Sequence, residues 1–97
     1  MRERRRFYRV RRDTLATLCK EDTLTPVKVY DLGAEGAGLI SFSPLKINEK
    51  VKLLFPYKEE KILFEGRIVW ARREKKEWWA GMLFYRPRFL LISPLIS

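Results

Sequence analysis

The 97-residue chain contains no histidine and only one cysteine, Cys19. A disulfide needs two cysteines, and most zinc and haem sites use cysteine or histidine ligands. Neither a disulfide framework nor such a metal site is therefore expected. A lone thiol is compatible with a reducing compartment, so we expect a cytoplasmic protein. The absence of histidine also removes the commonest general base of enzymes.

Other arrangements that support catalysis are missing as well. Neither the cysteine nor any serine has an evident activating partner in the sequence, and no pair of acidic residues has the spacing of a general acid and base. Asp31 and Glu35 are close in sequence, but glycines surround them. We expect a binding protein and not an enzyme, with no cofactor.

Long apolar runs are absent too. The basic N-terminus is followed by the stretch DTLATLCKED, which lacks the apolar core of a signal peptide. Near the C-terminus, the apolar segment RFLLISPLIS has ten residues and a proline, about half the length of a membrane-spanning helix. We expect no membrane span. Three destinations stay open for this tail, residues 87–97: the domain itself, a second subunit in a homodimer, or another protein.

Positive charge is concentrated at one end of the chain. There are 21 basic and 12 acidic residues, a net charge of +9, and the first twelve residues alone hold seven arginines and one glutamate. The rest of the chain is nearly balanced. Charge concentrated in this way favours an anionic partner. Taken alone, residues 1–12 would suit nonspecific binding to RNA, DNA or anionic lipid as well as a specific site.

Apolar and polar residues alternate along short runs separated by turn residues, which is the pattern of β-strands. No stretch shows the apolar stripe of an amphipathic helix. The runs cover residues 14–19, 25–32, 39–42, 50–57, 61–72 and 77–85. Six strands with tight connections predict an all-β fold, a six-stranded antiparallel β-barrel over residues 13–86, preceded by a flexible basic arm, residues 1–12.

The alternation also assigns the tryptophans and one glycine. Trp70 has the same parity as the apolar residues of the fifth run, and Trp78 has that of the sixth, so both are predicted to lie in the core. Trp79 has the opposite parity and is predicted to face outward. Gly66 lies in the middle of the fifth run, where a glycine usually marks a β-bulge or a sharp bend.

Two short stretches stand out from this barrel pattern. The first is RRRFYR, residues 4–9, in which Arg5 and Arg9 are four apart. The second is DLGAEG, residues 31–36, which we expect to form the turn between the second and third strands. Gly36 and the nearby Gly38 allow positive φ and close approach of backbone, and Asp31 offers a carboxylate that accepts N–H donors.

These two stretches resemble the signature of PilZ domains, in which RxxxR is followed some twenty residues later by [D/N]xSxxG at a strand–turn–strand junction. The segment GRIVWARR, residues 66–73, is similar to a late strand of that family, and WAGMLF, residues 79–84, is similar to its closing strand. The resemblance therefore extends along nearly the whole chain. It implies a six-stranded antiparallel barrel that binds the bacterial second messenger cyclic di-GMP.

The resemblance also implies roles for individual residues. Arg5 and Arg9 would grip phosphate and guanine, with Arg4 as an auxiliary cation, and Asp31 would accept from guanine N1–H and N2–H₂. Gly36 would let the backbone turn close beneath the ligand. An arginine fork can donate two hydrogen bonds to guanine O6 and N7, and its plane can stack on a purine. Because a receptor of this size has no output domain, it would need a downstream protein partner.

One position departs from the family pattern, because Gly33 stands where the motif has serine. Losing a hydroxyl donor to a charged phosphate removes roughly 1.5–3 kcal/mol, which weakens binding about ten- to a hundredfold without abolishing it. We therefore retain ligand binding as the leading hypothesis, with the Gly33 backbone N–H in the site. Two alternatives stay open: an adaptor that no longer binds nucleotide, and a nonspecific nucleic-acid-binding arm, which the matching glycine motif disfavours.

Overall fold

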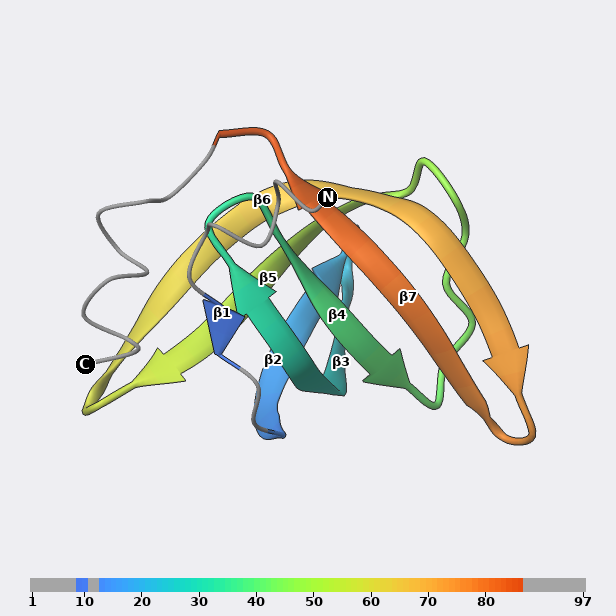
Figure 1. The fold of residues 1–97 in the computed structure, drawn as a ribbon, viewed down its shortest axis with the longest axis horizontal. Helices are drawn as coiled ribbons and strands as arrows, with labels where there is room; N and C mark the ends of the chain where they lie inside the picture. Colours follow the sequence, from blue (N-terminus) through green and yellow to red (C-terminus); the bar gives the residue numbers. More distant parts are fainter. Residues whose placement is uncertain (1–8, 11–12, 87–97) are drawn as a thin grey trace.

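The computed structural model describes residues 9–10 and 13–86, and these form seven β-strands. The strands are β1 (Arg9–Val10), β2 (Thr14–Lys20), β3 (Thr23–Gly33), β4 (Gly36–Ser41), β5 (Lys50–Tyr57), β6 (Glu60–Glu74) and β7 (Glu77–Phe84). Strands β2 to β7 close into an antiparallel barrel, which confirms the predicted all-β class and six-stranded barrel (Figure 1). Within the described ranges there is no helix with the length and hydropathy needed to cross a membrane.

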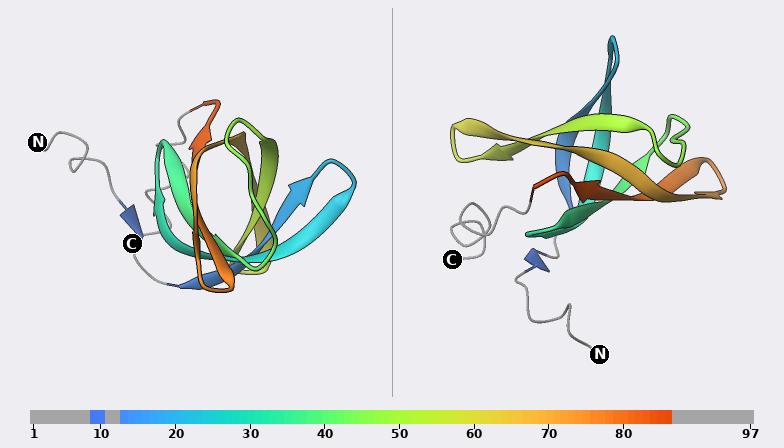
Figure 2. Two further views of the ribbon diagram at one scale, coloured as in Figure 1. Left: turned by 90° about the vertical axis from the view of Figure 1, so that its right-hand side faces the viewer. Right: turned by 90° about the horizontal axis from the view of Figure 1, so that it is seen from above.

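The order of strands around the barrel is β3-β2-β5-β6-β7-β4, and β4 closes the ring by pairing with β3. The strands β3 and β6 are the longest, with 11 and 15 residues, and each takes part in both sides of the barrel. We call β4, β7 and the parts of β3 and β6 paired with them the β4–β7 wall. We call β2, β5 and the parts of β3 and β6 paired with them the β2–β5 wall. The β2–β3 hairpin extends away from the ring (Figure 2).

The core fills the barrel with the inward-facing residues of both walls. Leu18, Leu53 and Phe64 are fully buried, and the rings of Phe64 and Phe84 stack with their centroids 4.5 Å apart. Leu45, in the connection between β4 and β5, is also buried. Burying each large apolar side chain stabilises the fold by about 1.5–3 kcal/mol, so this single core provides most of the driving force.

The turn between β3 and β4 is shorter than expected. Residues 31–33 belong to β3 and Gly36 begins β4, which leaves only Ala34 and Glu35 in the turn. None of the five glycines has a positive φ, so Gly36 and Gly38 do not use that part of the conformational freedom that the sequence analysis names for them. Close approach is the reason for glycine instead, because a Cβ at Gly36 would lie 2.3 Å from the Met82 carbonyl oxygen.

Two β-bulges interrupt the β4–β7 wall. The register of β3 against β4 shifts between Val29 and Asp31, and that of β6 against β7 shifts between Ile68 and Trp70. An extra residue in a strand lets two successive side chains face the same side. The dipeptides 30–31 and 69–70 thus face outward, each between neighbours that point into the core.

The bulge in β6 explains an error in the sequence analysis. Trp70 is 40% exposed, so its predicted place in the core is wrong, and Trp78 is half-buried and lies outside the fully buried set. Trp79 faces outward as predicted and is half-buried against Tyr30. Gly66 has regular register on both sides, so no bulge is present there. A Cβ at Gly66 would lie 2.1 Å from the carbonyl oxygen of Leu83, which requires glycine for close strand contact.

Candidate functional site

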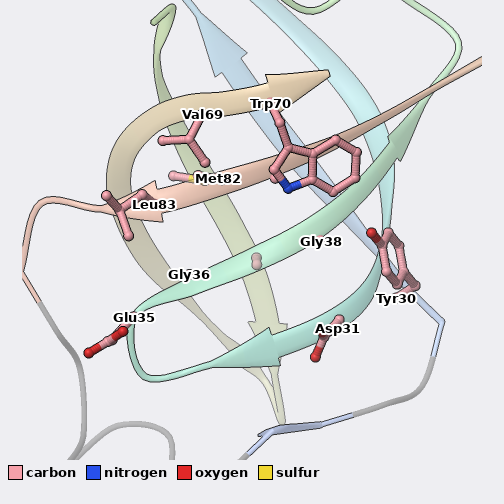
Figure 3. A pocket seen from close by; sticks show the side chains of 11 residues that line it. Tyr30, Asp31, Glu35, Gly36, Gly38, Val69, Trp70, Met82 and Leu83 are labelled. Atoms are coloured by element: carbon pink, nitrogen blue, oxygen red, sulfur yellow. The ribbon is translucent and has the colours of Figure 1, made fainter. Parts of the chain in front are cut away.

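The two bulges face one open depression of about 320 Å³ on the outer surface of the β4–β7 wall, which we call the groove (Figure 3). It is lined by Tyr30, Asp31, Glu35, Gly36, Ala37, Gly38, Val69, Trp70, Gly81, Met82 and Leu83. All four residues of the dipeptides 30–31 and 69–70 are in this set. Bulges often redirect side chains beside functional sites, so their convergence marks the groove as the candidate site.

Two glycines form the floor of the groove and two aromatic rings lie on it. Gly38 and Gly81 are direct partners in the β4–β7 pair. A Cβ at Gly81 would lie 2.1 Å from Nε1 of Trp70, and one at Gly38 would lie 2.5 Å from Cζ of Tyr30. The Tyr30 ring also packs against Trp79, with centroids 5.2 Å apart. The glycines therefore set the height and orientation of both rings, which a side chain at either position would displace.

The charge of the groove is negative. Asp31 and Glu35 line it, and no lysine or arginine is present among its described lining residues. The backbone oxygen of Glu35 accepts a hydrogen bond of 2.8 Å from the Phe84 N–H, which fixes the short turn against β7. Carboxylates accept N–H donors and repel anions. A ligand that carries phosphate would therefore need cations supplied from outside this lining.

The N-terminal arm reaches the barrel next to the groove. Arg9 pairs with Gly33 and Val10 pairs with Leu32, so β1 adds to the end of β3. The backbone of the second arginine of RxxxR thus lies beside the motif position that departs from serine. Arg4 and Arg5 lie outside the described residues. The structure brings together the backbone of Arg9 with the 31–36 stretch, which contains the other three predicted site residues.

No metal site accompanies these residues. Across residues 9–10 and 13–86, no three side chains of acidic residues, cysteine or histidine lie together in a way that could hold a metal ion. The groove lining presents two carboxylates, which accept N–H donors, and two aromatic rings, on which a planar group can stack.

A family model of the PilZ domain matches residues 3–94. The chain belongs to the PilZ family. Among solved structures, this PilZ domain is similar to the inhibitor of motility of Bacillus subtilis (MotI/DgrA), with a TM-score of 0.70 and 13% sequence identity. The match covers 97% of this chain and 48% of that chain, so this chain spans about half the length of that protein. Identity at this level shows a common fold only. No curated protein matches the chain.

Sequence reasoning missed the aromatic part of the groove in this PilZ domain. The sequence offers Trp70, Trp78 and Trp79 as an aromatic platform for a ligand, but strict alternation favours the core for Trp70 and Trp78, and it does not single out Tyr30. A sequence signal was present only in β3, where the apolar residues Val29 and Leu32 are three apart with Tyr30 and Asp31 between them, and the structure shows the same arrangement in both strands. Val29 and Leu32 are both buried, and so are Ile68 and, in part, Ala71. Two inward residues three apart in one strand indicate a bulge, with the two residues between them facing outward.

Proposed function

We propose that this PilZ domain binds cyclic di-GMP in the groove and acts as a receptor module. The observation that carries the proposal is the pairing of Arg9 with Gly33, because it brings the backbone of residues 9–10 to the edge of a groove whose described lining contains no lysine or arginine. The groove's volume, about 320 Å³, is at the lower end of the range for small-ligand sites, about 300–1,000 Å³. Its open side leaves room for the arm to complete the site.

The chemistry of the ligand matches the two halves of this arrangement. Cyclic di-GMP has two guanines and two phosphates. The N1–H and N2–H₂ donors of a guanine suit the Asp31 carboxylate, and an exposed base face suits the Trp70 ring, a contact that contributes about 1–3 kcal/mol in nucleic-acid complexes. Arg5 and Arg9 would donate to the phosphates and to guanine O6 and N7, with Arg4 as an auxiliary cation. Three arginines offset the two carboxylates of the groove.

Gly33 and Gly36 belong to the same proposal. Gly33 lacks the hydroxyl of the family motif, so we expect weaker binding than a serine would give, with the backbone N–H of Gly33 as the remaining donor. Gly36 starts β4, where a Cβ would contact the backbone of β7, and it therefore keeps one end of the groove shallow. Neither feature prevents a ligand held mainly by arginines.

Binding would pass a signal on by ordering the arm. In this proposal, residues 1–12 are the arm, residues 13–86 are the barrel, and the tail is 87–97. Closure of the arm over the ligand changes the surface that the module offers, which is an order–disorder switch. The output then depends on another protein or on self-association. As a receptor for a bacterial second messenger, the module would work in the cytoplasm and would not itself be an enzyme.

Titration calorimetry with the full chain tests this proposal. Cyclic di-GMP should bind, and Arg9→Ala should weaken binding at least about thirtyfold, because removing one partner of a desolvated charge pair costs about 2–5 kcal/mol. Arg12→Ala is the matched control: it removes the same charge from the arm but lies outside RxxxR. It should change affinity less than about threefold, since it alters only the general field. No heat at millimolar ligand would refute the proposal.

The base provides a second control. Cyclic di-AMP has the same phosphates, but adenine carries an amino donor where guanine has O6 and lacks the N2 amino group. It should therefore bind much more weakly. If both dinucleotides bind alike, if the two arginine variants lose affinity equally, and if affinity falls steeply with salt, the arm is a nonspecific polyanion binder.

One observation favours a second function, an adaptor that acts through protein contacts without nucleotide. Gly33 replaces the serine of the motif, and its backbone is paired with β1. An adaptor predicts no binding of cyclic di-GMP by the parent chain and none after restoring the serine. The groove would then be a surface for a protein segment.

A further inference from the structure

A second depression, of about 560 Å³, lies on the outer surface of the β2–β5 wall and shares no lining residue with the groove. We call it the Cys19 pocket. Its lining includes Cys19 and the apolar residues Leu24, Val51 and Tyr85, together with charged residues of β5, β6 and the β2–β3 turn. Leu24 is 69% exposed and Tyr85 is 51% exposed. Two large apolar side chains next to a thiol are thus left uncovered by the described residues.

The chain leaves the barrel at this pocket. The backbone N–H of Tyr85 donates a 2.9 Å hydrogen bond to the carbonyl oxygen of Glu65, so Tyr85, the residue that follows β7, lies beside β6. The Tyr85 side chain is itself part of the pocket lining. The tail that follows contains only one charged residue, Arg88, and six large apolar residues: Phe89, Leu90, Leu91, Ile92, Leu95 and Ile96.

We propose that the tail of the same chain covers the Cys19 pocket. An apolar segment and an exposed apolar surface bury each other favourably, and here the segment begins at the rim of the surface. The PilZ match extends to residue 94, so most of the tail is counted within the family's domain and not beyond it. An extended stretch of eight residues spans up to roughly 26–29 Å, which is ample to cross the pocket.

The tether decides between this occupant and a second copy of the chain. A segment attached a few residues from its site has a millimolar effective concentration there. A second copy at micromolar concentration competes poorly with it. The inference is independent of the proposed function, because neither the tail nor the pocket takes part in nucleotide binding.

Cys19 is the only cysteine, so the rate at which the full chain reacts with a thiol reagent measures how accessible the Cys19 pocket is to solvent. Replacing both Leu91 and Ile92 with aspartate should raise that rate at least about tenfold, the factor expected when one modest apolar contact is lost. Adjacent residues of an extended segment face opposite ways, so the double change removes the contact whichever residue makes it. Leu15→Asp is the control, because Leu15 is 72% exposed outside the pocket and should leave the rate unchanged.

A disulfide trap gives a second measurement if the double variant fails to fold. In an Ile92→Cys chain, mild oxidation should join position 92 to Cys19 within one molecule. A covalent dimer, or protection of Cys19 that disappears on dilution, would assign the pocket to a second copy and overturn the inference. Equal Cys19 rates in the parent and the double aspartate variant, or no disulfide in the trap, would also overturn it.

Discussion

The two walls of this barrel have similar interiors and different exteriors. In the part of the chain that the structure describes, the β2–β3, β2–β5 and β5–β6 pairs keep regular register, so the β2–β5 wall is an unbroken ladder. The β4–β7 wall contains both bulges and four glycines, Gly36, Gly38, Gly66 and Gly81, of which Gly66 also pairs with β5. Both walls still send buried apolar residues inward. The irregularity of the β4–β7 wall therefore serves its outer surface and not the core.

This difference assigns the two walls different roles: the regular β2–β5 wall mainly stabilises the fold, and the irregular β4–β7 wall forms the candidate binding surface. A bulge leaves a residue out of the ladder, and a glycine in a strand gives up roughly 0.5–1 kcal/mol relative to alanine. These features weaken the β4–β7 wall, while they create a flat floor with two rings and a carboxylate above it. The regular β2–β5 wall closes the same barrel and offsets that weakness. Changes in one wall should thus affect folding, and changes in the other should affect the ligand.

Single-residue deletions should give the largest contrast. Deleting Leu54 from β5 reverses the facing of every residue on one side of the deletion, so a core residue such as Phe55 turns outward. We expect loss of the entire folding free energy, which is about 5–15 kcal/mol for such a domain. Deleting Val69 removes the bulged residue of β6, so Ile68 and Ala71 both stay inward. This variant should fold and lose the shape of the groove.

Circular dichroism with thermal melting measures the first effect, and calorimetry with cyclic di-GMP measures the second. Deleting Tyr30 is a parallel test, because it heals the bulge in β3 and leaves Val29 and Leu32 inward. If deletion of Val69 or Tyr30 unfolds the chain as completely as deletion of Leu54, the bulges are needed for the barrel itself, and the contrast between the walls is lost.

Gly66, which is shared by both walls and lies outside the groove lining, and Gly81, on the floor of the groove, should also differ in their effects on folding and binding. Alanine at Gly66 places a Cβ 2.1 Å from the backbone carbonyl oxygen of Leu83, which cannot move aside, so we expect a loss of about 3 kcal/mol in the free energy of unfolding. Alanine at Gly81 meets the Trp70 side chain, which can swing away, so the loss should be nearer 1 kcal/mol.

The affinity for cyclic di-GMP should show the reverse order, with the larger loss in Gly81→Ala and the smaller loss in Gly66→Ala. Gly81→Ala displaces the Trp70 ring and should weaken cyclic di-GMP binding about tenfold, with a shift of the tryptophan emission, whereas Gly66→Ala should bind nearly as the parent does. Urea unfolding and calorimetry give the two quantities. A Gly81→Ala variant that binds like the parent would show that the ring is not part of the ligand site.

Restoring the motif hydroxyl should have a smaller and opposite effect. Gly33→Ser should tighten cyclic di-GMP binding about tenfold, because a hydroxyl donor to a charged phosphate adds roughly 1.5 kcal/mol. Gly33→Ala is the matched control, since it adds the Cβ without the donor. An increase in both variants would point to backbone stiffening, and no binding in any of the three chains would favour the adaptor.

The smallest effect should come from a surface ion pair of the β2–β5 wall. Lys52 Nζ lies 3.9 Å from Glu65 Oε2, and the two side chains are 59% and 50% exposed. Lys52→Ala should change the free energy of unfolding by less than about 0.5 kcal/mol, with no effect on the ligand. Urea unfolding at low and high salt checks this. A larger loss would mean that the regular wall depends on its surface charges.

Much of the barrel could be predicted because most strands obey a strict period of two. The alternation in β5 is unbroken, and Val51, Leu53 and Phe55 are buried as their parity indicates. Where a strand contains a bulge, parity before and after the bulge disagree, and a prediction extended through it fails. Trp70 was assigned to the core for this reason.

The candidate site was only half visible in the sequence. The backbone of Arg9 pairs with that of Gly33 in the 31–36 stretch, since local motifs fix the end of β3 and β1 pairs there. The aromatic half of the groove comes from β6 and β7, far along the chain, and its position depends on cross-strand register. Gly38 and Gly81 face each other only after the barrel closes. No local pattern encodes that contact, whereas the spacing of Val29 and Leu32, three residues apart, does indicate the bulge in β3.

The pairing of β1 with β3 consists of two residue pairs, Arg9 with Gly33 and Val10 with Leu32. Backbone hydrogen bonds contribute about 1 kcal/mol each on balance, so a ladder this short has a free energy of only a few kcal/mol. Ordering the backbone of each residue costs about 1–2 kcal/mol of conformational entropy, which offsets most of that gain and leaves a small net free energy of pairing. A ligand whose contacts with the attached arginines contribute a similar free energy can shift most molecules into the paired form. A single amino-acid substitution in β1 or at the end of β3 could therefore change the ligand concentration at which β1 pairs.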